Sequence, residues 1–165
     1  MDRLWTPWRL AYVTEAGTPT PDCIFCDALA RGEAEPLIVH RGRAAFVILN
    51  KFPYNNGHLM VVPRRHVGWF ADLSADELRE FSELAQRAEV ALMGAYHPQG
   101  FNFGVNLGKA AGAGVLDHLH LHVVPRWSGD TNFMSVVGET RVLPEELPQT
   151  AARLRAAFNA LSRPE

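Results

Sequence analysis

Residues 117–127 read DHLHLHVVPRW, a run that places histidines at the alternate positions 118, 120 and 122. Successive side chains of a β-strand point to opposite faces. In an extended chain His118, His120 and His122 therefore share one face, and the apolar residues between them share the other. A row of imidazoles suits proton transfer, nucleophilic attack or metal binding, because histidine titrates near neutral pH. A surface histidine run or a metal-scavenging tract is the alternative, but the apolar residues and the adjacent glycine-rich loop favour a reactive site.

The composition is that of an ordinary globular protein. The chain has 165 residues, of which 47% are hydrophobic and 21% are charged, which is enough for one compact domain with its own core. A net charge of −2 argues against long nucleic acid as a partner. The N-terminal stretch lacks the apolar core of a signal peptide, and no apolar run is long enough to cross a bilayer. We therefore expect a cytoplasmic protein with no membrane partner.

The order of the predicted elements indicates an α+β fold with an antiparallel sheet of about five strands. Alternating or short apolar runs predict strands at residues 36–40, 44–49, 57–63, 101–107 and 118–125. Ser74 and Glu77 have the spacing of a capping box, and apolar residues from Leu78 then recur with a helical period to about Tyr96. A C-terminal helix is expected from about Pro144 to Leu161, with Pro144 near its first turn.

The segment 118–124 has the order His-φ-His-φ-His-φ-φ, where φ is apolar, and it resembles the signature of the histidine triad family at every position. Residues 48–67 (ILNKFPYNNGHLMVVPRRHV) resemble the ribose-binding strand and hairpin of that family, and residues 101–108 (FNFGVNLG) resemble its phosphate-facing segment. Residues 4–9 and 124–144 resemble the branch that contains bacterial diadenosine tetraphosphate phosphorylases and related hydrolases.

The resemblance implies one domain over residues 1–165. We expect residues 1–22 to form an N-terminal arm, with a partly ordered tail as the alternative, residues 23–127 to form the catalytic core, and residues 128–165 to form a C-terminal loop and helix. It also implies a homodimer whose two sheets run continuously across the interface. His40 and His97 fit no part of the pattern and are expected at the surface or in loops.

The resemblance implies that His120 is the nucleophile. A neutral imidazole attacks without first becoming an anion, and a phosphorus–nitrogen bond is readily transferred onward. His122, in its protonated form, would contact the phosphate and assist the leaving group. His118 completes the triad, and His58 opens a strand from which it can orient these rings. The alternative for His58 is a buried histidine that has partners but no chemical role.

Substrate contacts are expected from two asparagines and one loop. By resemblance, Asn50 binds ribose and Asn106 contacts the phosphates or the surroundings of the nucleophile. Asn50 can instead initiate a turn, a common use of asparagine before a loop. In the loop, backbone N–H groups are expected to line the phosphates and a lysine to add positive charge, unless the loop is a plain connection. The loop residues are Gly108, Lys109, Gly112 and Gly114.

The same loop departs from the family pattern. Many triad proteins carry Gln followed by Ser or Thr shortly before the first histidine, and those side chains bind phosphate. Residues 112–115 are Gly-Ala-Gly-Val here, and the loop is one residue longer. This departure weakens any transfer of substrate preference from the smaller nucleoside phosphoramidases and favours the phosphorylase-like branch, in which an emptier loop can admit a phosphate acceptor.

Cys23 and Cys26 are the two cysteines of the chain and have C-x-x-C spacing. This spacing is common in tetrahedral zinc sites, but two ligands are too few. The resemblance implies that His66 and His118 complete a structural Zn²⁺ site. A redox pair and two core cysteines without a metal are the alternatives.

The function expected first is cleavage of diadenosine tetraphosphate through a covalent adenylyl-histidine, with phosphate as acceptor and ATP and ADP as products. Hydrolysis of dinucleoside polyphosphates or of nucleoside phosphoramidates would use the same residues. A nucleotide-binding sensor that keeps the triad but does not turn over is the alternative outside enzymes.

Overall fold

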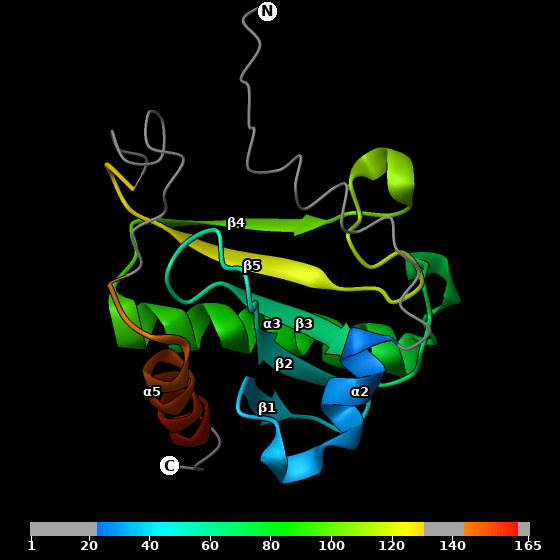
Figure 1. Cartoon of the computed structure of the whole chain (residues 1–165), viewed down its shortest axis with the longest axis horizontal. Coiled ribbons are helices and arrows are strands. Elements are labelled where there is room, and N and C mark those ends of the chain that lie inside the picture. The colour runs from blue at the N-terminus through cyan, green and yellow to red at the C-terminus, as the bar shows by residue number, and fades with distance from the viewer. Residues whose placement is uncertain (1–22, 131–143, 162–165) are drawn as a thin grey trace, which may run out of the picture.

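The computed structural model describes residues 23–130 and 144–161 and confirms the α+β fold with a five-stranded antiparallel sheet (Figure 1). The strand order is β1-β2-β3-β5-β4. The strands are β1 (Ile38–Arg41), β2 (Ala45–Leu49), β3 (Leu59–Pro63), β4 (Gly100–Val105) and β5 (Leu121–Arg126). The α-helices are α2 (Ile24–Ala30), α3 (Ala75–Tyr96) and α5 (Leu147–Ala160), and the short 3-10 helices are η1 (Gly32–Ala34), η2 (Phe70–Asp72) and η3 (Lys109–Ala111). None of the helices in these two ranges is long and apolar enough to span a membrane.

Helix α3 begins where the capping box predicts. The backbone N–H of Glu77 donates to Ser74 Oγ at 3.3 Å, and the Ser74 N–H donates to the Glu77 carboxylate at 2.8 Å. These bonds satisfy two of the N–H groups that a helix start leaves without partners. The buried face of α3 carries Phe81, Leu84 and Leu92, whereas Leu78, in the first turn, is 39% exposed.

The two faces of the sheet are covered by different layers. Helix α3 lies behind the sheet in Figure 1 and α5 lies at the lower left, near β1; their side chains form one core with the residues of the strands that point toward them. Helix α2 lies in front, where Phe25 packs with Phe46 and Val62 in a second cluster. All five residues of β2 and all five of β3 are consequently buried. The sequence gives no clear helical signal for α2, which has only 7 residues.

Strand β5 starts later than predicted. The ladder with β3 ends at the pair Val61–Leu121, so residues 118–120 lie ahead of the strand. Residues 118–120 make a different backbone contact, in which the Leu119 N–H donates to the Val67 carbonyl at 2.7 Å. The segment after β3 therefore continues alongside the triad and takes the place of regular strand pairing.

The C-terminal helix also begins later than predicted, at Leu147 instead of Pro144. A capping box between Glu146 and Gln149 sets its start, and Pro148, in its first turn, takes the place expected of Pro144. Phe158 of this helix is fully buried and stacks on the His40 ring with centroids 5.1 Å apart. A loop position for His40 is therefore wrong, because His40 lies in β1, where it is half-buried against α5.

Candidate active site

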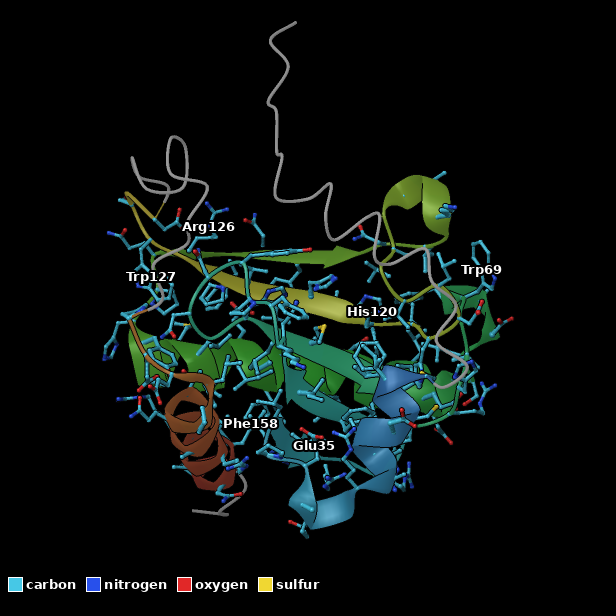
Figure 2. All side chains as sticks on the ribbon, in the orientation of Figure 1. Glu35, Trp69, His120, Arg126, Trp127 and Phe158 are labelled. Carbon is cyan, nitrogen blue, oxygen red and sulfur yellow. The ribbon has the colours of Figure 1, made fainter. Side chains whose placement is uncertain are left out.

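The imidazoles of the triad lie at and just before the start of β5, where Figure 2 labels His120. The His120 and His122 ring centroids lie 4.9 Å apart, and the buried Phe25 ring lies 5.4 Å from His118 and 5.2 Å from His120. Leu119 points the other way, into the core formed with α3. The alternation predicted from the sequence is therefore present, although only His122 lies within the strand itself.

His120 is held by its own backbone. Its Nδ1 lies 2.9 Å from the His118 carbonyl oxygen, which can only accept, so the network assigns the ring proton to Nδ1. Nε2 then carries the lone pair. His120 is 5% exposed, and burial lowers its pKa below the ordinary value of 6.5. The ring is consequently neutral at neutral pH, with a nitrogen able to attack.

His58 and His122 form a second hydrogen-bonded pair. The Tyr54 backbone N–H donates to Nδ1 of His58 at 3.1 Å, so the His58 proton is on Nε2. That Nε2–H donates to Nδ1 of His122, 2.9 Å away. The proton of His122 is then on its own Nε2. The Tyr54 ring lies over both imidazoles, with centroids 4.6 Å from His58 and 5.8 Å from His122.

Asn50 lies at the end of β2 and makes a turn contact. Its Oδ1 accepts the Phe52 N–H at 2.9 Å, which is the turn-initiating role left open by the sequence. Its Nδ2 lies 3.4 Å from Nδ1 of His58, so the structure places Asn50 next to the second histidine pair.

The loop between β2 and β3 is fastened to the end of β5. Asn55 Nδ2 lies 3.1 Å from the Pro125 carbonyl oxygen and 2.7 Å from the Asp130 carboxylate, to both of which it can donate. Asp130 also accepts from Arg126 at 2.6 and 2.9 Å, which holds the Asp130 pKa well below its usual range. Gly57 has φ +77°, and a Cβ there would lie 2.9 Å from Leu92, so both backbone and space require glycine.

The glycine-rich loop adopts a turn that uses part of its own hydrogen-bonding capacity. The N–H groups of residues 111, 112 and 113 donate to the carbonyls of Gly108 or Lys109. Those three groups are therefore not aimed at a ligand, contrary to the expectation for the loop as a whole. Gly108, with φ +78°, and Gly112, with φ +81°, shape the turn, and Lys109 is exposed. Asn106 lies just beyond the end of β4.

Cys23, Cys26, His66 and His118 converge, with their ligand atoms all within 4.8 Å of one another. Nδ1 of His118 lies 3.1 Å from Cys23 Sγ and 3.6 Å from Cys26 Sγ, and Nδ1 of His66 lies 3.4 Å from Cys26 Sγ. Neighbouring ligands around a tetrahedral zinc ion are separated by roughly 3.3–3.8 Å, given metal–ligand bonds of about 2.0–2.3 Å. The four residues therefore fit a Cys₂His₂ metal site.

The orientation of His118 supports this fit. Its Nε2 lies 2.8 Å from the Pro63 carbonyl, to which it donates, so Nδ1 is deprotonated and faces the two sulfurs. Burial and the Cys23 thiol beside it raise the pKa of Cys26 to about 11. A cation at the centre of the cluster would lower the pKa of the Cys26 thiol again, because metal ligation favours the thiolate.

Two site residues were missed by the sequence reasoning. Phe25 lies between the two cysteines in sequence and supports both His118 and His120, and its position inside the C-x-x-C motif is the signal that points to it. The Tyr54 backbone N–H donates to Nδ1 of His58 and so places the His58 proton on Nε2. A backbone contact of this kind leaves no pattern of side chains in the sequence.

Comparisons with known proteins agree with this geometry. The family model described as HIT domain matches residues 31–129. A Mycobacterium tuberculosis protein named AP-4-A phosphorylase is 41% identical over 157 residues, covering 91% of this chain and 80% of that protein.

Two solved structures are similar in fold as well as in sequence. A zinc-bound histidine triad family protein from Mycobacterium smegmatis matches with a TM-score of 0.69 and 30% identity, covering 87% of this chain and 97% of that one. A hypothetical histidine triad nucleotide-binding protein from Sulfolobus tokodaii matches with a TM-score of 0.71 and 27% identity, covering 86% and 95%. The chain belongs to the histidine triad (HIT) family.

Proposed function

We propose that this protein cleaves dinucleoside polyphosphates, diadenosine tetraphosphate first among them, by way of a covalent adenylyl-histidine on His120. The observation that carries the proposal is the hydrogen bond from His120 Nδ1 to the His118 carbonyl, which leaves Nε2 deprotonated and ready to attack. The relative named AP-4-A phosphorylase, 41% identical over 157 residues, supports the choice of substrate.

In the first step, His120 Nε2 attacks the α-phosphorus of the bound dinucleotide. A nitrogen–phosphorus bond forms, the bond from phosphorus to the bridging oxygen breaks, and ATP leaves. Holding the α-phosphate in line with Nε2 is the main task of the site, because phosphoryl-type transfers depend on positioning and charge stabilisation.

His122 assists departure of ATP through its Nε2–H. The contacts from Tyr54 to His58 and from His58 to His122 support a donor on the outer nitrogen of His122. A hydrogen bond from that donor to the bridging oxygen stabilises the charge that builds there. The leaving polyphosphate is a stable anion and does not require full protonation.

In the second step, inorganic phosphate attacks the adenylyl group. The nitrogen–phosphorus bond breaks, His120 regains its lone pair, and ADP is released. The loop residues Gly112 and Gly114 leave room where related proteins carry Gln and Ser or Thr, which favours phosphate over water as acceptor. Lys109 adds positive charge at this side, and Asn50 and Asn106 are assigned to the ribose and the phosphates.

Cys23, Cys26, His66 and His118 would hold a zinc ion, and four protein ligands leave no open coordination position. The ion would supply structural stability. Because the His118 carbonyl accepts the hydrogen bond from His120 Nδ1–H, fixing the His118 backbone also fixes the direction of the nucleophile.

We also propose that the protein is a homodimer. β4 is an edge strand, and Asn102, Phe103 and Gly104 on it are exposed. An edge with unpaired backbone groups can pair with the same edge of a second copy and extend the sheet. Sedimentation analysis at micromolar concentration tests this expectation, and a monomer at that concentration would contradict it.

Product analysis tests the proposed reaction. Incubation of diadenosine tetraphosphate with labelled inorganic phosphate is expected to place the label in ADP, with ATP unlabelled. AMP and ATP without label would mean hydrolysis. During turnover, the native protein is expected to gain the mass of one adenylyl group. His120→Ala is expected to show neither this mass gain nor turnover. A fully active variant would show that His120 is not the nucleophile. Tight binding without products, or faster cleavage of an adenosine phosphoramidate, would support the alternative functions.

A further inference from the structure

Trp69 lies at the surface between β3 and α3 and is 57% exposed (Figure 2). One exposed aromatic residue is ordinary. Trp69, however, forms one wall of a pocket of about 430 Å³ that the segment 65–69 makes with Asp72 and Asp117. That volume lies in the range of small-molecule sites, which begins at about 300 Å³.

This pocket adjoins the proposed phosphate loop. The Trp69 ring edge (Cη2) would lie 3.7 Å from a Cβ built on Gly108, the residue that opens the loop. The segment carrying Trp69 also runs beside the approach to the triad, because the Leu119 N–H donates to the Val67 carbonyl and a Cβ on Gly68 would lie 3.3 Å from the Leu116 carbonyl oxygen. The indole therefore lies next to the start of the loop, and the segment that carries it runs beside the residues that lead to the nucleophile.

The distance from pocket to nucleophile suits a polyphosphate chain. Asp117 lines the pocket and His120 follows three residues later, so their Cα atoms lie no more than about 11 Å apart. A tetraphosphate can bridge such a span, whereas a single phosphate cannot. A dinucleotide bound with its α-phosphorus at His120 would then have its second nucleoside at the pocket.

The charges of the pocket favour a nucleoside over a phosphate. The Arg65 guanidinium is engaged, with its Nε and Nη2 both 2.8 Å from the Glu77 carboxylate. Asp72 and Asp117 contribute carboxylates to the lining. Carboxylates accept from ribose hydroxyls and from an exocyclic amine, but they repel phosphate. Phosphates would therefore remain by the loop and Lys109 while the base and sugar enter the pocket.

We propose that Trp69 stacks on the base of the second nucleoside, the one that leaves with the polyphosphate, and that this pocket makes the protein prefer dinucleotides to mononucleotides. The inference rests on the proposed function and adds a subsite to it. Stacking of a base on an aromatic ring stabilises binding enough to change affinity by about tenfold or more.

The test compares two substrates that share the reacting phosphate. Diadenosine tetraphosphate carries the second nucleoside, and adenosine 5′-tetraphosphate lacks it. Trp69→Ala is expected to raise KM for the first by about tenfold, with kcat and the KM for the second unchanged, and Trp69→Phe is expected to retain most of the native affinity. Met93→Ala, at an exposed position on α3, is the control and should change neither KM. Melting temperatures confirm that each variant is folded.

Equal changes for both nucleotides, or no change for either, would overturn the assignment of Trp69. Failure of the native protein to cleave either nucleotide would instead overturn the proposed function. In that case binding still tests the pocket, because diadenosine tetraphosphate should quench more tryptophan fluorescence in the native protein than in Trp69→Phe. Equal quenching in the two proteins would show that no base stacks there.

Discussion

The Nε2 of His58 lies 2.9 Å from Nδ1 of His122, and this contact joins the residue just before β3 to the triad histidine that lies within β5. Because the Tyr54 N–H occupies the other nitrogen of His58, the proton of His58 is directed at His122. One backbone amide in a loop thus determines which nitrogen of His122 can donate toward the substrate.

The first prediction concerns this relay. His58→Leu removes the donor that orients His122, and we expect kcat to fall by roughly 10- to 100-fold while KM changes little, as for other residues that hold a reacting group in its tautomer. His58→Gln keeps an amide donor and should retain more of the rate. The measurement is steady-state kinetics on diadenosine tetraphosphate, with the melting temperature as a check on folding. Equal loss in both variants would assign His58 to packing alone.

The second prediction concerns the metal cluster. Cys23→Ser removes one of four ligands, so we expect loss of stoichiometric zinc and a lower melting temperature, by about 2–4 °C for each kcal/mol of stability lost. Metal analysis of the purified proteins and thermal unfolding are the measurements. Asp27→Asn, on the same helix but outside the cluster, should keep both properties. Full zinc content in Cys23→Ser would contradict the ligand set.

The third prediction follows from the half-buried position of His40. Burial first, and then the Arg87 guanidinium, whose Nη1 lies 3.2 Å from His40 Nε2, lower the pKa of His40 below 6.5, while Glu80 acts in the opposite direction. Just below pH 6.5, His40 is therefore protonated more fully in the unfolded chain than in the folded chain. Stability from this residue is complete above pH 6.5 and decreases as the pH falls below that value.

His40→Phe is expected to reduce this pH dependence while keeping a ring against Phe158. Urea unfolding at pH 7.5 and at pH 5.5 gives the free energy of unfolding, and the difference between the two should be smaller in the variant than in the native protein. The other histidines contribute to both proteins equally, so the comparison isolates His40. An identical difference in the two proteins would contradict the assignment.

The sequence predicts most of the fold because its strongest signals are local. The capping box at Ser74 and Glu77 marks the start of α3, and the His-φ-His-φ-His run identifies the family and the strand that bears the site. The start of β5 was misplaced because Leu119 pairs with Val67 outside the ladder, a contact between distant parts of the chain. Helix α2 was missed because it is short and depends on packing against the sheet.

For the site, the sequence indicates which residues converge but not how their rings are hydrogen-bonded. The four metal ligands were named from resemblance, and the structure brings them together. The contact between His58 and His122 depends on the Tyr54 backbone, which no spacing in the sequence connects to these rings. The internal hydrogen bonds of the loop at residues 111–113 likewise follow from its turn geometry, which its small residues permit but do not specify.

The last prediction concerns the fastening of the β2–β3 loop. Asn55 lies within hydrogen-bonding distance of the Pro125 carbonyl and of Asp130, so it holds the loop from which Tyr54 reaches His58. Asn55→Ala removes these bonds and should let the loop move, which would weaken the orientation of His122 without touching the substrate. We expect kcat to fall by about tenfold, since misplaced reacting groups lower rates steeply. Gln99→Ala removes a comparable bond to Ser128 at the same end of β5, away from this loop, and should leave kcat unchanged.

A double-mutant cycle distinguishes positioning from general destabilisation. If Asn55 acts through His58, the double variant Asn55→Ala/His58→Leu should be no slower than His58→Leu alone, because the relay is already broken. If Asn55 affects activity only by lowering stability, the two losses in kcat should multiply. Additive losses in activation free energy would therefore show that Asn55 acts only through stability. No further loss in the double variant would show that Asn55, held by Asp130, positions His122 through His58.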